Sequence, residues 1–423
     1  MLDWQWLRRR NLPDGAKQGI VIGVSLLFVG IIYILGRLFL SLQGMDEGLF
    51  TELVGILLTV LLIDGLRNIG ADIEIRKSLI RRAASTSNET AKAAIDELRK
   101  TGLIDRGVLR AVDLSGAVLT RAVLTNIDFA NSNLSTADFT CSNFNHSNLT
   151  KAIFSNSMFN ETIFGTAVIQ KADFTKAKLH NCSLNANRNL QGIIFTDAEL
   201  EEVNFDEADL SNARFDKTSL TATTFRGCTL NEAIFVRYQS MGDSREQPFA
   251  AKVLGAVSFE RAILRDAILE YVRFESTDFT KADMNHAKCK GTVFQKANLQ
   301  GADLTGAVLE GASFIKIELD GTTRLPNQET LQEIWNEYDE VEISYQNVEQ
   351  EFREYILSYF DNIGVKDFSA SISIGKIIQD DESGTAYEDH QVQIDSSEQR
   401  MSPKLPQLGK SSLDNSPTED EEI

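Results

Sequence analysis

The stretch Ala297–Phe314, "ANLQGADLTGAVLEGASF", repeats its large apolar residues at every fifth position. These residues are Leu299, Leu304, Leu309 and Phe314, and an alanine stands two residues before each of them. An α-helix repeats apolar residues about every 3.6 positions and a flat strand about every 2 positions. A period of five fits neither element. It therefore indicates a regular repeat structure that is neither a single helix nor a flat strand.

The same period covers about half of the chain. It begins near Leu109 and continues to Leu319, and nearly all of its central positions hold Leu or Phe. One extra residue shifts the register near Asn185, and residues 236–253 leave the pattern altogether. The position two residues before each centre is small, and it is mostly Ala. We therefore expect one repeat domain over residues 109–325.

Several five-residue segments, such as "ADFTK", "ADLSN", "ANLQG" and "ADLTG", match the pattern A-(D/N)-L-x-x. In this the chain resembles the pentapeptide-repeat family. The resemblance implies an all-β, right-handed quadrilateral β-helix, a β-solenoid with four pentapeptides per coil. Stacked coils are about 4.8 Å apart, so residues 20 apart should stack directly, as Phe139 on Phe159 and Phe144 on Phe164. The same family includes membrane-anchored members with hydrophobic helices before the repeats, and this chain resembles those.

The repeat assigns a core role to most residues that otherwise suggest chemistry. Cys182 and Cys228 fall on the small inward position and Cys289 on a central one, so we interpret all three as core residues. Cys141 and His146 fall on adjacent faces, where they are not stacked as a metal pair would be. The sequence contains no nucleophile elbow, phosphate-binding loop or metal-ligand spacing. It therefore predicts a protein without catalytic residues, metal or cofactor.

Two further expectations concern polar residues of the repeats. His180 and His286 have no evident carboxylate or cysteine partner in the sequence. The Asp or Asn that follows the small residue is expected to face solvent as part of the repeat pattern.

Two apolar segments precede the repeats. Residues 18–41 include 18 uncharged residues from Gly19 to Gly36 and are long enough to span a bilayer, and residues 47–66 form a second, less apolar segment. In an antiparallel hairpin, Arg37 and Glu52 would lie at similar depth. They either form an ion pair there or both extend to the interface.

The Lys and Arg residues predict the orientation of these segments. They flank the hairpin on both outer sides, within residues 1–17 and beyond residue 66, and the turn "QGMDEG" has none. The positive-inside rule then places both termini and the repeat domain in the cytoplasm. A cleaved signal peptide is the alternative interpretation of the first segment. It is disfavoured because the segment is long, no clear cleavage site follows, and a second apolar segment comes next.

Residues 67–108 are predicted to form a helical stalk that ends in a cap. "TSNETAKAAIDELRKTG" offers Thr86 as an N-cap with Glu89 three residues later, which is a capping-box pattern. Its apolar stripe suits a helix that covers the open end of the repeats, because repeat arrays need capping segments.

The insertion at residues 236–253 is the first candidate site. Arg and Tyr are frequent anchors of protein interfaces, so the loop is a candidate partner-binding surface. The alternative is a tolerated surface insertion. The candidate residues are Arg237, Tyr238, Met241, Arg245 and Phe249.

After the repeats the apolar spacing alternates between three and four, which is coiled-coil periodicity. It predicts one amphipathic helix over residues 327–361 that pairs with another copy, packs along the rod, or caps the rod's end. Residues 369–378 are expected to add a short strand, and residues 362–423 are expected to be an acidic, largely disordered tail. The helix-interface candidates are Leu331, Tyr338, Val341, Tyr345, Val348, Phe352, Tyr355 and Tyr359.

Charge separates the candidate functions. The net charge of −19 divides into +2 for residues 1–108, −4 for 109–325 and −17 for 326–423. A pentapeptide protein that mimics DNA and binds a topoisomerase needs dense negative charge along the rod, and these repeats are nearly balanced. The sequence favours a membrane-tethered scaffold for protein–protein interaction. A self-assembling or pore-forming membrane oligomer is the remaining alternative. The expected partners are lipid, an unidentified protein and a second copy of the chain, with no nucleic acid or small-molecule substrate.

Overall fold

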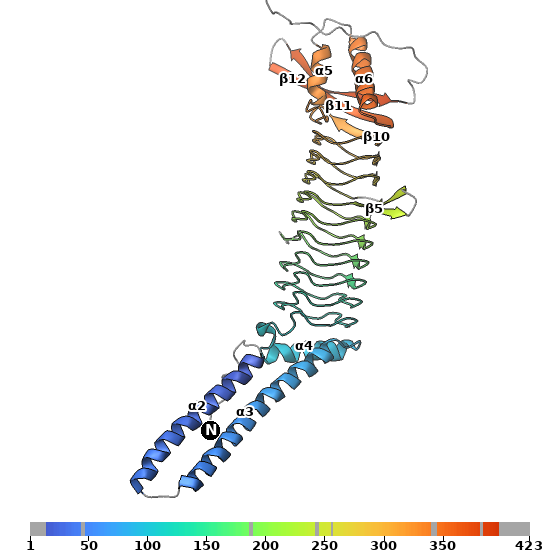
Figure 1. Cartoon of the computed structure of the whole chain (residues 1–423). Helices are drawn as coiled ribbons and strands as arrows, with labels where there is room; N and C mark the ends of the chain where they lie inside the picture. Colours follow the sequence, from blue (N-terminus) through green and yellow to red (C-terminus); the bar gives the residue numbers. More distant parts are fainter. Residues whose placement is uncertain are drawn as a thin grey trace, which may run out of the picture.

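The computed structural model describes residues 14–43, 47–185, 189–241, 245–254, 257–339, 345–380 and 384–396. Figure 1 shows a helical hairpin at one end, a long rod in the middle and a mixed helical and β cap at the other end. The rod is a β-solenoid, which confirms the fold that the resemblance to the pentapeptide-repeat family implies.

Each coil of the rod has four faces of five residues. Backbone bridges join residues 20 apart, from Asp113 and Asn133 through Ile153 and onwards, and all of those along the rod are parallel. At most corners the residue two after the centre turns the chain with a positive φ, for example 57° at Lys151 and 56° at Lys281. The left-handed conformation is strained for residues other than Gly, Asn and Asp. At most corners it is held because the corner amide also donates to a carbonyl in the next coil, as the Lys151 amide does to Gln170 at 2.9 Å.

On one face the bridges widen into short strands. Together with the C-terminal strands β11 (Asp367–Asp380) and β12 (Gly384–Asp395) they form one ten-stranded sheet in the order β1-β2-β3-β4-β7-β8-β9-β10-β11-β12. The strands of the rod are β1 Met158–Asn160, β2 Lys178–His180, β3 Glu199–Glu201, β4 Ser219–Thr221, β7 Lys252–Leu254, β8 Arg273–Glu275, β9 Val293–Gln295 and β10 Ser313–Asp320.

The core is a stack of rings and aliphatic side chains along the rod axis. Phe139 stacks on Phe159 with ring centroids 5.2 Å apart, and Phe144 stacks on Phe164 at 5.6 Å, which confirms the predicted stacking. The single extra residue also has its expected effect, because Asp173 bridges Ile194, 21 positions later.

The N-terminal helices differ from the predicted division into two spans and a separate stalk. Helix α2 covers Asp14–Gln43, and α3 runs without a break from Glu47 to Ala83. Helix α4, Asn88–Lys100, then lies across the end of the rod (Figure 1), and a 3₁₀ turn, η1 Ile104–Arg106, leads into the first coil.

Helix α4 covers the rod with the predicted stripe, because Ala91, Ala94, Ile95 and Leu98 are all buried in the rod's core. The predicted capping box is wrong. The N-cap is Ser87 rather than Thr86, and its side chain makes no capping hydrogen bond.

The C-terminal region differs most from the sequence prediction. The single helix over residues 327–361 is wrong, because Trp335 of α5 (Leu331–Asp339) contacts Phe352 of α6 (Tyr345–Asn362) with ring centroids 5.2 Å apart. A continuous helix would place these residues about 25 Å apart. The two helices instead pack side by side over the end of the rod (Figure 1).

The predicted disordered tail is also wrong for its first part. Strand β11, Asp367–Asp380, pairs in parallel with β10, and β12, Gly384–Asp395, pairs antiparallel with β11. The predicted strand at residues 369–378 is therefore confirmed and is longer than expected. Alternating residues Phe368, Ala370, Ile372 and Ile374 are buried, so the pair extends the sheet of the rod and closes its core.

Candidate interaction surfaces

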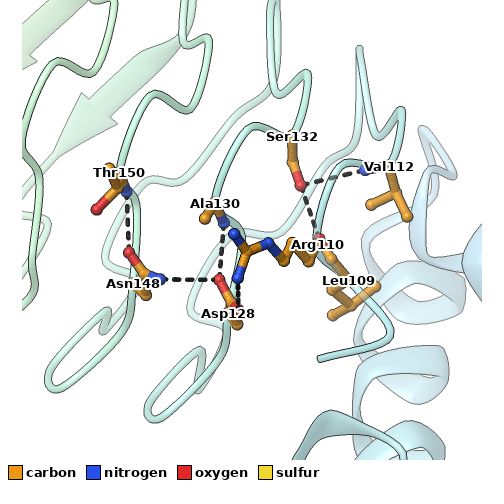
Figure 2. Close-up of polar contacts among 8 residues, drawn as sticks. All are labelled: Leu109, Arg110, Val112, Asp128, Ala130, Ser132, Asn148 and Thr150. Carbon is orange, nitrogen blue, oxygen red and sulfur yellow. Dashed lines mark hydrogen bonds and ion pairs between the residues drawn. The ribbon is translucent and has the colours of Figure 1, made fainter. Parts of the chain in front are cut away.

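The Asp and Asn side chains of the repeats hold the coils together instead of simply facing solvent (Figure 2). The Asp128 Oδ1 atom accepts a hydrogen bond from the Ala130 amide at 3.0 Å and another from Asn148 Nδ2 in the next coil at 3.1 Å. Asn148 Oδ1 in turn accepts from the Thr150 amide at 3.1 Å. These side chains each fix the turn that follows them and tie one coil to the next.

A hydroxyl at the small inward position makes a second kind of link. The Ser132 hydroxyl donates to the Leu109 carbonyl at 2.7 Å and accepts from the Val112 amide at 3.3 Å (Figure 2). The same donation across 23 residues recurs along the rod at Ser142, Ser157, Thr162, Thr218 and Thr292.

The buried cysteines belong to the core, as the repeat register predicts. Cys182 donates to the Phe159 carbonyl and Cys228 to the Phe205 carbonyl, at the same inward position as the serines. Burial raises the pKa of Cys182, Cys228 and Cys289 to about 12. A thiol with such a pKa stays protonated and is a poor nucleophile.

The histidines are less isolated than the sequence suggests. His180 Nδ1 lies 3.2 Å from Glu201 Oε2, which corrects the expectation that this histidine lacks a carboxylate partner. His146 Nδ1 lies 2.6 Å from the Thr166 hydroxyl, and Cys141 lies near Glu161. Among the residues that the structure describes, no three His, Cys, Asp or Glu side chains gather as a metal site would need.

The insertion forms a β-hairpin that projects from the side of the rod (Figure 1). Strands β5, Val236–Met241, and β6, Arg245–Ala250, pair antiparallel in a two-stranded sheet of their own. The register pairs Arg237 with Phe249, Tyr238 with Pro248, and Met241 with Arg245. Because strand positions alternate between faces, positions 237, 241, 245 and 249 share one face of the hairpin and 238 belongs to the other. The side chains of these five candidates lie outside the described part of the chain.

The C-terminal helices use a different apolar stripe from the predicted heptads. Of the predicted interface residues, Leu331 and Phe352 are buried as expected, whereas Tyr355 and Tyr359 are only partly buried. The other buried positions of the two helices include Trp335, Ile356 and Phe360, which the heptad pattern did not select. The Tyr359 hydroxyl accepts from the Asn327 amide at 3.1 Å, which ties α6 to the end of the repeats. Val341 lies outside the described residues, as do the side chains of Tyr338, Tyr345 and Val348.

One groove lies at this end of the rod. It has a volume of about 660 Å³ and lies between β10, β11, β12 and α6, with Lys316, Glu318, Arg353 and Asp395 among its lining residues. Its charges are mixed, so it does not favour one ligand class.

The helical hairpin exposes large apolar side chains. Both helices are long and apolar enough to cross a membrane, over Gly19–Gly36 and Val54–Ala83. Leu27 is 67% exposed, Ile34 68% and Ile63 60%. Of the predicted Arg37–Glu52 pair, Glu52 is exposed and the Arg37 side chain lies outside the described part.

The repeats are similar to a known family. The family model described as Pentapeptide repeats (8 copies) matches residues 117–156, 154–185, 189–221, 258–288 and 287–323. Its matches stop on either side of the β5–β6 hairpin.

Several solved structures are similar to the rod. HetL, a pentapeptide repeat protein involved in heterocyst differentiation regulation from the cyanobacterium Nostoc sp. strain PCC 7120, is 22% identical with a TM-score of 0.33, over 56% of this chain and 98% of that one. Full-length QnrB1, a plasmid-mediated fluoroquinolone resistance protein, is 16% identical with a TM-score of 0.26, over 52% and 90% of the two chains. Rfr23 from the cyanobacterium Cyanothece 51142 is 18% identical with a TM-score of 0.19, over 35% and 90%. The search of curated proteins found no match to this chain.

Proposed function

We propose that this chain, which belongs to the pentapeptide-repeat family, is a non-enzymatic scaffold tethered to a membrane by α2 and α3. The observation that carries the proposal is the hairpin. Among the described residues, its two apolar helices expose side chains such as Leu27 and Ile34 of α2 and Ile63 of α3, and large exposed apolar surfaces are typical of membrane or protein contact.

The cationic residues support a cytoplasmic rod. Arg76, Lys77, Arg81 and Arg82 lie at the end of α3 nearest the rod, and the positive-inside rule assigns such residues to the cytoplasmic side. The rod then lies next to these cationic residues, because α4 follows α3 and packs on the first coils of the rod. The Arg99 guanidinium donates to the Val123 and Thr125 carbonyls at 3.0 and 3.1 Å.

The β5–β6 hairpin is the proposed partner-binding element. It interrupts a rod whose other coils bond continuously to one another, and it carries Arg237 and Tyr238, residue types common at interface hot spots. Many Asp, Asn, Ser and Thr side chains of the rod link neighbouring coils, whereas the β5–β6 hairpin forms a two-stranded sheet of its own.

The first experiment tests membrane insertion and sidedness. We expect the chain to remain in the membrane pellet after alkaline extraction. Cys141 is half-buried and the other three cysteines are buried, so Cys141 reports on the rod. A membrane-impermeant maleimide should label Cys141 only after the cells are opened, whereas in a C141S background a Met45→Cys variant should be labelled in intact cells. Labelling of Cys141 in intact cells would contradict a cytoplasmic rod.

A second experiment tests partner binding by the β5–β6 hairpin. A photo-crosslinking amino acid at Tyr238 should give a discrete protein adduct in cells. The matched control places it at Tyr271, an exposed aromatic residue elsewhere on the rod. Equal adducts from both positions would contradict a specific role of the hairpin.

A further inference from the structure

The apolar parts of α2 and α3 lie level with each other. Val21 clusters with Ile69, and Val29 with Leu61. Residue 19 is therefore level with about residue 71, and residue 36 with about residue 54. The 18 residues of Gly19–Gly36 measure about 27 Å along a helix, which is close to the hydrocarbon thickness of a bilayer.

Two charged residues of α3 lie within this depth. Asp64 and Arg67 are the charged residues of segment 54–71, and the facing stretch of α2 has none. The side chains that turn towards α2 are others, because Leu61 and Ile69 are buried and Asp64 and Arg67 are exposed. The hairpin therefore carries an acid and a base on its outer surface at the depth of its apolar span.

A surface of this kind favours contact with another protein segment inside the membrane. Ionisable side chains within a bilayer are costly, and they usually face other protein segments and pair there. Asp64 and Arg67 are one turn apart on a face that also exposes Val60 and Ile63. This face is apolar with one acid and one base, so it is complementary in charge to another copy of itself.

We propose that this face of α3 packs against the same face of a second copy of the chain, with Asp64 of each copy paired with Arg67 of the other. Copies inserted in the same orientation are related by a two-fold axis along the membrane normal, so their α3 helices run parallel. Three residues separate the paired positions by about 4.5 Å along the axis, a distance that an arginine side chain spans. The proposal rests on the membrane insertion argued above.

Charge-changed variants test the pairing in the full chain. Donor- and acceptor-labelled copies are reconstituted in phosphatidylcholine vesicles, and association is measured by energy transfer. The wild type should associate. D64R and R67D should each lose self-association because like charges then face each other, and a mixture of the two variants should regain it. The exchanged variant D64R/R67D keeps one acid and one base per copy and should associate like the wild type.

A neutral variant tests the pairing even if the changed charge of D64R or R67D prevents the hairpin from inserting into the membrane. D64N/R67Q removes both charges, and its dimer should dissociate roughly tenfold more readily, because two symmetry-related polar pairs are lost. In a C141S background, Val60→Cys should form a disulfide between copies. Leu27→Cys, on the exposed side of α2, should not.

Flotation of the vesicles separates the two proposals. A wild-type chain that does not float with lipid overturns the membrane tether. A chain that floats but stays monomeric at every protein-to-lipid ratio overturns the self-association alone. Association that D64N/R67Q leaves unchanged overturns the Asp64–Arg67 pairing.

Discussion

Serine and threonine at the small inward position make a hydrogen bond that alanine at the same position does not. The Ser157 hydroxyl donates to the Leu134 carbonyl at 2.7 Å and accepts from the Ala137 amide at 3.2 Å. Both backbone groups belong to the preceding coil, so one side chain links two coils inside the rod.

Replacing Ser157 with alanine should destabilise the rod by about 1 kcal/mol, because a buried hydrogen bond is lost without a large cavity. Thermal unfolding of the full chain in detergent, followed by circular dichroism, measures the change. The control is Ser155→Ala, whose hydroxyl is less buried and makes one longer contact of 3.4 Å with Asp173. An equal effect of both substitutions would argue against the inward bond.

Phe225 tests the ring stack where it crosses the insertion. It stacks on Phe205 at 5.1 Å and on Phe259 at 4.8 Å, so it holds together the coils on either side of the β5–β6 hairpin. Phe225→Ala should lower the free energy of unfolding by roughly 3–5 kcal/mol. The control, Tyr271→Ala at an exposed position, should change this free energy little. Hydrogen exchange should rise first in the coils next to the insertion, and a uniform rise along the rod would contradict this local role.

The residue-scale predictions succeeded where one period determined the position. The register placed Cys182, Cys228 and Cys289 in the core and stacked Phe139 on Phe159. It missed the contact of His180 with Glu201, because the extra residue near 186 makes the stacked position 21 residues away. It also missed the hydrogen bonds of Asp128 and Asn148, since the period alone says nothing of how neighbouring side chains orient.

At the scale of elements, α5 begins with a capping box that the sequence analysis overlooked. The Glu333 amide donates to the Thr330 hydroxyl at 3.1 Å, and the Thr330 amide donates to Glu333 Oε2 at 2.7 Å. The signal was present as Thr330 followed three residues later by Glu333. The backbone N–H of Thr330 lowers the pKa of the Glu333 carboxyl below its ordinary value of 4.5.

This lowered pKa makes the start of α5 sensitive to acid. The carboxylate stabilises the folded state above its ordinary pKa, and the contribution is lost as pH falls through the lowered value. Glu333→Gln should therefore lower the unfolding temperature at neutral pH, and the difference from the wild type should vanish in strong acid. The buried Trp335 reports the transition by fluorescence in a W4F/W6F background. A difference that persists unchanged in acid would contradict the capping role.

Helix α4 should determine the stability of the N-terminal coils. Leu98 is fully buried against them, so Leu98→Ala should cost about 2–5 kcal/mol. In a repeat array each coil contacts only its neighbours, and the loss should therefore appear as faster hydrogen exchange near residues 109–148 before it reaches residue 290. The exposed Lys100→Ala is the control, and faster exchange at the far end first would contradict the capping role.

The elements flanking the repeats were harder to predict than the repeats. The alternating spacing of residues 331–359 fits one long helix, yet α5 and α6 fold back on each other around Trp335 and Phe352. Tertiary contact with the open end of the rod decides this arrangement. The end exposes Phe314, which packs on Phe360 and Phe368 at 5.6 and 6.1 Å.

At the scale of the whole molecule, the rod is closed at both ends. A chain truncated after Arg324 would expose Phe314 and Leu319. With its α2–α3 hairpin inserted in nanodiscs and no detergent in the buffer, this truncated chain should aggregate or bind a hydrophobic dye. A chain that ends at Ser396 keeps α5, α6, β11 and β12 and should behave as the full chain does. A soluble, monodisperse Arg324 truncation would contradict the closing role of the C-terminal elements.

The stacked coils also fix the distance between the N-terminal end of the rod and the β5–β6 hairpin. Six successive bridges lead from Asp113, near α4, to Ile234, next to the β5–β6 hairpin. At about 4.8 Å per coil, the hairpin is held roughly 30 Å beyond the first coil. Because each coil uses 20 residues, deleting or duplicating 20 residues would change this height by one step and leave the hairpin on the same side, whereas five residues would turn it to the adjacent side. Reach and direction can thus be changed independently in this molecule.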